Sequence, residues 1–99
     1  MKEEIILKIL NCKGFKHQAI VWIEELSELT KELTKILRKG YIDKKSLRNT
    51  QLEITDVQFC LDQIKMAIGY STEQQEKDYK YKVKRTLKRI KKDGKRKGN

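Results

Sequence analysis

Apolar residues recur at helical spacing in four stretches of the chain, and short breaks that contain glycine separate these stretches. In residues 15–39 the apolar positions recur every three or four residues, at Ala19, Trp22, Leu26, Leu29, Leu33 and Ile36. Residues 44–68 repeat this period at positions 54, 57, 61, 64 and 68. Such spacing places each set on one face of an α-helix. The pattern predicts two long amphipathic helices, over residues 15–39 and 44–68.

Two further helices are predicted, over residues 2–11 and from Ser71 or Thr72 to about Lys92. The last of them has apolar residues at positions 79, 83, 87 and 90. Gly40 and Gly69 follow the two long helices directly, as expected of C-terminal stops. Strand-like alternation is absent. The sequence therefore predicts an all-α protein: one four-helix bundle-like domain over residues 1–92, followed by a basic, frayed tail over residues 93–99.

The chain length and the distribution of charge narrow the range of functions. A domain of 99 residues buries a modest share of its surface, so we expect a thin core and self-association. Residues 1–76 hold 12 basic and 12 acidic side chains, whereas residues 77–99 hold 12 basic and two acidic ones. The formal charge of +10 therefore belongs to the last segment, and the rest of the chain is neutral.

The sequence contains no feature that predicts export or membrane insertion. Its longest apolar run, residues 19–23, is far shorter than the roughly 20 residues of a spanning helix. Cys12 and Cys60 lack the close spacing of metal ligands, and His17 is the single histidine, so a zinc site is not expected. We expect a cytoplasmic protein without a membrane partner, with both thiols free.

Acidic residues stand in two pairs, one on each predicted long helix. Glu25 and Glu28 are three residues apart, as are Glu53 and Asp56, so the members of each pair share a helical face. Each pair lies beside the apolar stripe of its helix. Antiparallel packing through the stripes would bring the four carboxylates to one edge of the core. Such a cluster repels itself unless a cation neutralises it, and oxygen ligands suit Mg²⁺, with Mn²⁺ as a substitute.

These acids also carry a family resemblance. Glu24-Glu25-x-x-Glu28, followed after 24 residues by Glu53-x-x-Asp56, resembles the EExxE…ExxD signature of the MazG-like all-α nucleoside triphosphate pyrophosphohydrolases. The resemblance implies a helical bundle that forms homodimers or homotetramers. It implies a Mg²⁺-dependent enzyme that cuts an NTP or dNTP to the monophosphate and pyrophosphate, with a role in cleansing the nucleotide pool. Its metal-binding and catalytic residues would be Glu25, Glu28, Glu53 and Asp56.

The resemblance also suggests where the substrate binds. Basic residues after the ExxD helix hold the triphosphate in this family, and the matching candidates are Lys82 and Arg85. Gln18 lies seven residues before Glu25 on the same face, and Trp22 lies between them, so both are candidates for a base pocket. Trp22 also belongs to the apolar stripe, where a core role is equally expected. Nothing in the sequence fixes the base or the sugar.

Two other classes of function remain as alternatives. The basic last segment is compatible with a small nucleic-acid-binding helical protein without catalysis, although the rest of the chain is neutral and no helix-turn-helix signature is present. A structural helical oligomer without activity is the third hypothesis. The intact acidic pattern favours the enzyme over both.

Overall fold

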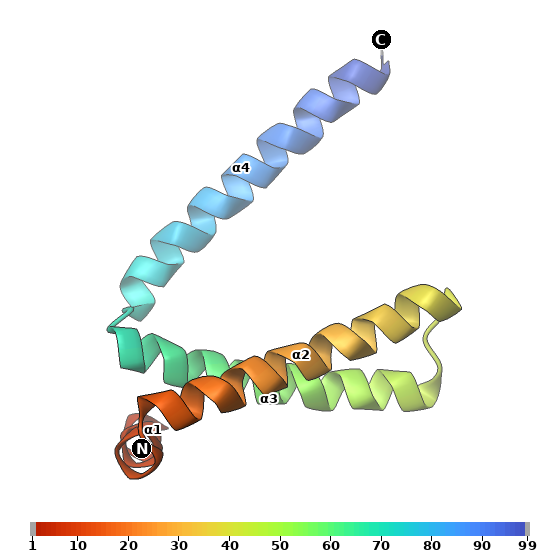
Figure 1. The fold of residues 1–99 in the computed structure, drawn as a ribbon. Helices are drawn as coiled ribbons and strands as arrows, with labels where there is room; N and C mark the ends of the chain where they lie inside the picture. The colour runs from red at the N-terminus through yellow and green to blue at the C-terminus, as the bar shows by residue number, and fades with distance from the viewer. Residues whose placement is uncertain (1, 99) are drawn as a thin grey trace. The chain divides into compact units, whose positions relative to one another are not determined.

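The computed structural model describes residues 2–98, and the side chains of residues 2–94. Apart from short turns, this range is helical, in the order α1 (Lys2–Lys13), α2 (Phe15–Lys39), α3 (Lys44–Ile68) and α4 (Thr72–Gly98) (Figure 1). Residues 2–98 contain no strand, so the predicted all-α class is confirmed. Within this range, none of the helices combines the length and the apolar character that a membrane crossing requires.

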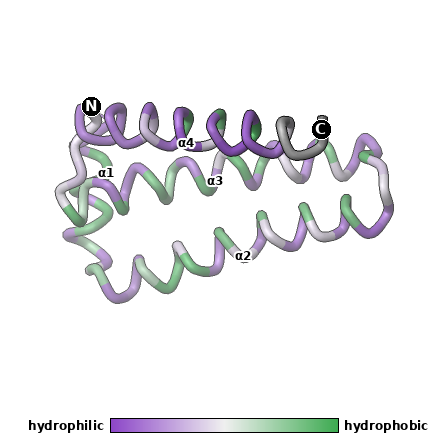
Figure 2. The backbone as a smooth tube through the Cα atoms, turned by 90° about the horizontal axis from the view of Figure 1, so that it is seen from above, coloured by the Kyte–Doolittle hydropathy of each residue, from purple (hydrophilic) through white to green (hydrophobic). Residues whose placement is uncertain are grey.

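The helices form two compact units, residues 1–69 and residues 70–99. This is a finer division than the single domain expected over residues 1–92. The division into two units matches the distribution of apolar residues. Helices α1, α2 and α3 alternate hydrophobic and hydrophilic positions, whereas α4 is mostly hydrophilic (Figure 2). Among the side chains of residues 2–94, all the buried ones belong to the first unit.

A tight turn over residues 40–43 joins α2 and α3 into an antiparallel hairpin (Figure 1). Gly40 ends α2 in the left-handed region, with φ +82°, and its N–H donates to the Ile36 carbonyl at 2.8 Å. Asp43 begins α3 as its N-cap, because its side chain accepts the Ser46 N–H at 2.7 Å. Both long helices therefore begin and end where the sequence predicts.

Helix α1 packs across the open end of this hairpin and contacts both α2 and α3 (Figure 1). Ile6 is its buried residue, with 2% of its surface exposed. An ion pair of 2.7 Å between Lys2 and Asp62 ties the start of α1 to α3. The helix extends to Lys13, two residues past its expected end, because the break comes at Gly14.

The core of the hairpin unit is small and partly polar. Its buried apolar residues are Ile6, Trp22, Val57 and Cys60, and its buried polar residues are Gln18, Ser46 and Gln63. Much of the predicted apolar stripe is exposed, with Leu33 at 52% and Ile54 at 54%. The thin core expected for so short a chain is confirmed, and the hairpin presents apolar surface to its surroundings.

Helix α4 begins after Ser71, whose hydroxyl oxygen accepts the Gln74 N–H at 3.1 Å. The helix continues to Gly98, past the end that the sequence predicts near Lys92. The frayed tail expected over residues 93–99 stays a prediction. Asn99 lies outside the described residues. Lysine favours helices, and a single interior glycine such as Gly94 costs only about 1 kcal/mol, so nothing in this sequence stops the helix earlier.

Candidate metal centre

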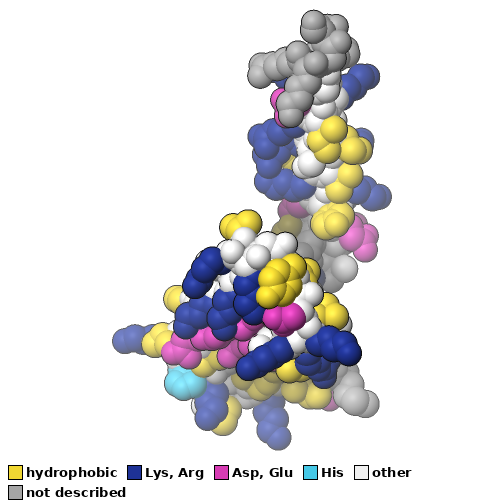
Figure 3. Space-filling model, turned by 90° about the vertical axis from the view of Figure 1, so that its right-hand side faces the viewer, with side chains coloured by type: hydrophobic (Ala, Val, Ile, Leu, Met, Phe, Trp, Pro, Cys, Tyr) yellow, Lys and Arg dark blue, Asp and Glu magenta, His cyan; other side chains and the backbone are white. Residues whose placement is uncertain are grey.

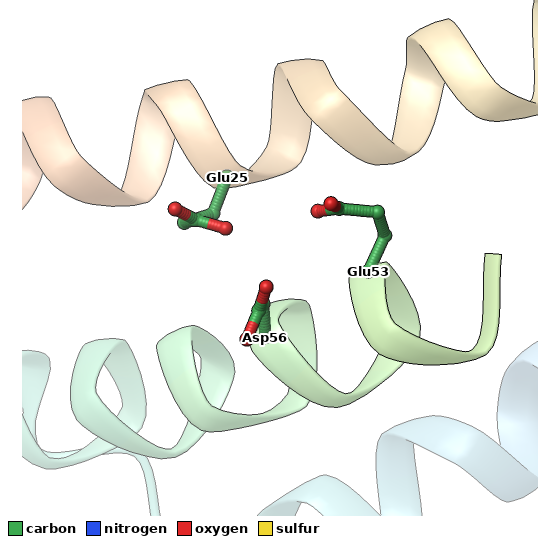
Figure 4. Close-up of side chains that lie close together, drawn as sticks. All are labelled: Glu25, Glu53 and Asp56. Carbon is green, nitrogen blue, oxygen red and sulfur yellow. The ribbon is translucent and has the colours of Figure 1, made fainter. Parts of the chain in front are cut away.

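Three carboxylates from two helices meet on the hairpin. Glu25 projects from α2, and Glu53 and Asp56 project from successive turns of α3, on the side that faces α2 (Figure 4). Each supplies one oxygen, and these oxygens all lie within 4.8 Å of one another. Glu53 and Asp56 share a face because they are three residues apart, and the antiparallel turn brings Glu25 opposite them. The structure thus assembles three of the four acids that the sequence singles out.

The environment of two members of this trio, Glu25 and Glu53, disfavours their ionised forms. Burial raises the pKa of Glu25 above its usual range, and the negative charges of Asp56 and Glu53 raise it further. Burial likewise raises the pKa of Glu53, followed by the charge of Asp56. The Oε2 atom of Glu53 is buried and has no hydrogen-bond partner within the described residues. A buried carboxylate oxygen without a donor is unfavourable, and a cation would relieve it.

Glu28 does not join the trio, in contrast to the expected quartet. Its carboxylate is half exposed and pairs with Lys31 at 3.3 Å, one turn along the same helix. Its charge still raises the pKa of both Glu25 and Glu53, so it lies near enough to act electrostatically. Surface ion pairs of this kind contribute little, so Lys31 holds Glu28 only weakly.

Glu32 is a contributor that the sequence analysis did not select. Its side chain is only 12% exposed, it pairs with Lys35 at 3.3 Å, and its charge raises the pKa of Glu53. The available signal was its spacing, because Glu32 lies seven residues after Glu25, on the same helical face.

A buried polar contact joins the two helices beside the acids. The Oε1 atom of Gln63 in α3 accepts hydrogen bonds from Gln18 Nε2 and from Trp22 Nε1 in α2, both at 2.9 Å. Gln18 and Trp22 are 6% and 5% exposed, so their polar groups serve the helix pair rather than an open pocket. Gln63 was missed by the sequence analysis, although an uncharged amide at a buried position of an apolar helix face was a usable signal.

Cys60 lies between this contact and the acids. The thiol is buried, and burial, followed by the charges of Glu25 and Asp56, raises its pKa. A raised pKa keeps the sulfur protonated, so it contributes packing rather than a thiolate ligand. Both Cys60 and Cys12 are free, as expected.

The two predicted phosphate-binding residues, Lys82 and Arg85, belong to α4 in the second unit. Lys82 is exposed, and the Arg85 guanidinium lies 5.9 Å from the centroid of the Tyr81 ring. The Nε atom of Arg85 is buried and has no hydrogen-bond partner within the described residues. These side chains provide positive charge, but they belong to a separate unit from the three acids.

The chain matches no protein-family model, no curated protein and no solved structure. Inferences about its chemistry therefore rest on the site itself and on the resemblance of its acidic pattern.

The donor set of the trio fits a hard divalent cation. All three side chains offer oxygen, which is the ligand type that Mg²⁺ and Mn²⁺ prefer. Three charges in one small volume need neutralisation, and the orphaned Oε2 of Glu53 is a free acceptor within it. Three protein ligands would also leave coordination positions for water or for substrate oxygens, because Mg²⁺ is octahedral.

Proposed function

We propose that the chain is a Mg²⁺-dependent nucleoside triphosphate pyrophosphohydrolase, which cuts an NTP or dNTP to its monophosphate and pyrophosphate. The observation that carries this proposal is the convergence of Glu25 with Glu53 and Asp56, from two helices, within 4.8 Å. These are also the positions that match the EExxE…ExxD pattern. Without a metal, three acids gathered in this way only destabilise the hairpin, and that favours a functional reason for their position.

In this proposal each group of residues has one role. Glu25, Glu53 and Asp56 hold the cation, and Glu28, whose charge already acts on Glu25 and Glu53, is the fourth candidate ligand once its weak pairing with Lys31 is broken. When bound, Mg²⁺ supplies charge to neutralise the phosphates and makes a bound water more acidic. The basic side chains of α4, with Lys82 and Arg85 as the first candidates, hold the negative triphosphate.

The proposal includes a homo-oligomer, either a dimer or a tetramer. Its support is the apolar surface of the hairpin, where Leu26, Leu33 and Leu61 are 39%, 52% and 39% exposed. A second copy of the chain would cover this surface and enlarge the core. Light scattering coupled to size-exclusion chromatography measures the mass directly, and a monomer at micromolar concentration would contradict this part.

The test is a panel of ribo- and deoxyribonucleoside triphosphates with Mg²⁺ or Mn²⁺, with pyrophosphate measured separately from phosphate. We expect pyrophosphate from at least one nucleotide. Asp56→Asn should reduce the rate by at least about 100-fold, since even groups that only support metal ligands contribute about 10–100-fold. Glu4→Gln is the matched control, because Glu4 is exposed on α1 and lies outside both the trio and the EExxE…ExxD pattern.

Two results would overturn the proposal. One is the absence of pyrophosphate release across the whole panel with either metal. The other is equal loss of activity in Asp56→Asn and Glu4→Gln, since the activity would then not depend on the trio. Circular dichroism of both variants shows whether the helices are retained.

A further inference from the structure

Five lysines form a continuous stripe along α4. The stripe consists of Lys77, Lys80, Lys84, Lys88 and Lys91, spaced three, four, four and three residues apart. This spacing places all five on one helical face. All five side chains are exposed. With a rise of about 1.5 Å per residue, the stripe is about 21 Å long.

The charge of this stripe is not balanced from within the helix. Residues 77–92 contain nine basic side chains and one acidic one, Asp78. That carboxylate already accepts hydrogen bonds from the Tyr70 hydroxyl and from Gln74 Nε2. Among the described residues, none of the five lysines is paired with a carboxylate. The stripe therefore presents a row of positive charge to a partner.

An aromatic side chain lies beside the stripe. Tyr81 is 62% exposed and comes four residues after Lys77 and three before Lys84. The Arg85 guanidinium lies 5.9 Å from the centre of its ring. Aromatic rings and arginine planes next to a basic track are what unpaired nucleic-acid bases stack on.

The flank of α4 next to the stripe has a different character. Tyr79, Val83, Leu87 and Ile90 are exposed there, and Figure 3 shows hydrophobic groups beside the Lys and Arg groups of this helix. A helix that lies in a membrane surface places its aromatic residues on the apolar side, among a large apolar area. Here Tyr79 lies in the apolar set, but Tyr81 lies among the basic residues, and the apolar set has only four members in the part of α4 whose side chains are described. The arrangement favours nucleic acid over a lipid surface.

We propose that α4 binds single-stranded nucleic acid, with the five lysines along the phosphate backbone and Tyr81 against a base. At about 3.4 Å per phosphate in one strand of a duplex, a 21 Å stripe matches about six phosphates. The proposal extends beyond the pyrophosphohydrolase and does not require it, because the five lysines are distinct from Lys82, Arg85 and the acidic trio.

The test measures binding of the full chain to a fluorescently labelled 20-nucleotide single-stranded DNA at 50 to 200 mM salt. Five neutralised phosphates predict a slope of log K against log salt of about −3.5, which weakens binding about 100-fold over this range. In the variant Lys80→Gln/Lys84→Gln/Lys88→Gln the slope should shrink by about 2. Glutamine keeps the helix, since its helix propensity is close to that of lysine.

The control removes the same charge elsewhere. Lys44, Lys45 and Arg48 are exposed at the start of α3, and their replacement by glutamine should leave the slope unchanged. An equal decrease of the slope in the two triple variants would overturn the proposal that the lysine stripe binds nucleic acid, since net charge alone would then explain binding. No binding at 50 mM salt would also overturn it.

Two further measurements separate the alternatives. Tyr81→Ala should weaken binding about 5- to 100-fold, as loss of one base stack does, whereas Tyr79→Ala, on the apolar side, should not. Tighter binding to vesicles that contain one third anionic lipid than to the oligonucleotide would overturn the proposal in favour of a membrane. Asp56→Asn should bind DNA normally, so hydrolysis and nucleic-acid binding fail independently.

Discussion

Replacement of Glu53 by glutamine removes one of the three charges in the acidic trio while nearly keeping the shape of the side chain. Two unit charges 4.8 Å apart interact by about 3.5 kcal/mol at an effective dielectric of 20, and by about 0.9 kcal/mol in water. Glu53 is half-buried, so solvent screens part of this repulsion. The substitution relieves repulsion from two neighbours and removes a buried charge that lacks a donor. We expect the metal-free protein to gain about 1–2 kcal/mol.

The assay is thermal unfolding followed by circular dichroism, with chelator and then with Mg²⁺. In chelator, a gain of 1 kcal/mol should raise the Tm of Glu53→Gln by about 4–8 °C. In Mg²⁺ at 100 times its Kd, the wild-type chain should gain about 2.7 kcal/mol, and the variant much less because it lacks a ligand. Glu53→Gln should therefore have the higher Tm in chelator, and the wild-type chain the higher Tm in Mg²⁺.

Glu24→Gln is the matched control, because Glu24 is exposed, lies outside the trio and is not among the charges that raise the pKa of Glu25 or Glu53. It should change the stability in chelator by less than about 0.5 kcal/mol, as most surface substitutions do. If Glu53→Gln is no more stable than wild type in chelator, the three acids do not repel one another as argued. If Mg²⁺ leaves the wild-type Tm unchanged, they do not form a cation site.

Two other predictions concern pH and the buried amide. The folded chain raises the pKa of Glu25 and Glu53 above 4.5, so as the pH falls it binds protons before the unfolded chain does. The protein in chelator should therefore become more stable as the pH falls from 7 towards 4.5. Urea midpoints measured at each pH test this, and a midpoint that falls over this range would contradict it. Gln63→Leu leaves the Trp22 and Gln18 donors buried without an acceptor and should cost about 2–4 kcal/mol. Urea denaturation measures this loss of stability. An equal loss in Gln58→Leu, at an exposed position of α3, would show that the buried hydrogen bonds of Gln63 are not its cause.

The boundaries of the long helices were predictable because the residues at their ends act locally. Gly40 and Gly69 stop α2 and α3 in left-handed conformations, with φ of +82° and +73°, and Asp43 caps α3 through its own side chain. The end of α4 was not predictable in this way. Its last segment contains good helix formers and no proline, so the only local signal was Gly94, which does not stop the helix.

The acidic trio was predictable because spacing within a helix fixes which side chains share a face. Glu53 and Asp56 follow from that rule alone, and the short turn then determines that Glu25 faces them. The same rule does not predict where the Glu28 carboxylate lies, because that side chain pairs with Lys31, one turn further along α2, and not with the trio. The role of Gln63 was predictable only in part, since an amide on an apolar helix face indicates a buried polar contact but not its partners on the other helix.

The brevity of the α2–α3 turn has a consequence for how the protein folds. Its four residues place the first contacts between the two helices close together in sequence, whereas the Gln18–Gln63 contact at the open end joins residues 45 apart. Because closing a short loop costs less entropy than closing a long one, we expect the hairpin to form from the turn outwards. Since a metal that binds only the folded form adds its binding energy to folding, a cation at the proposed site would couple its own binding to closure of the hairpin.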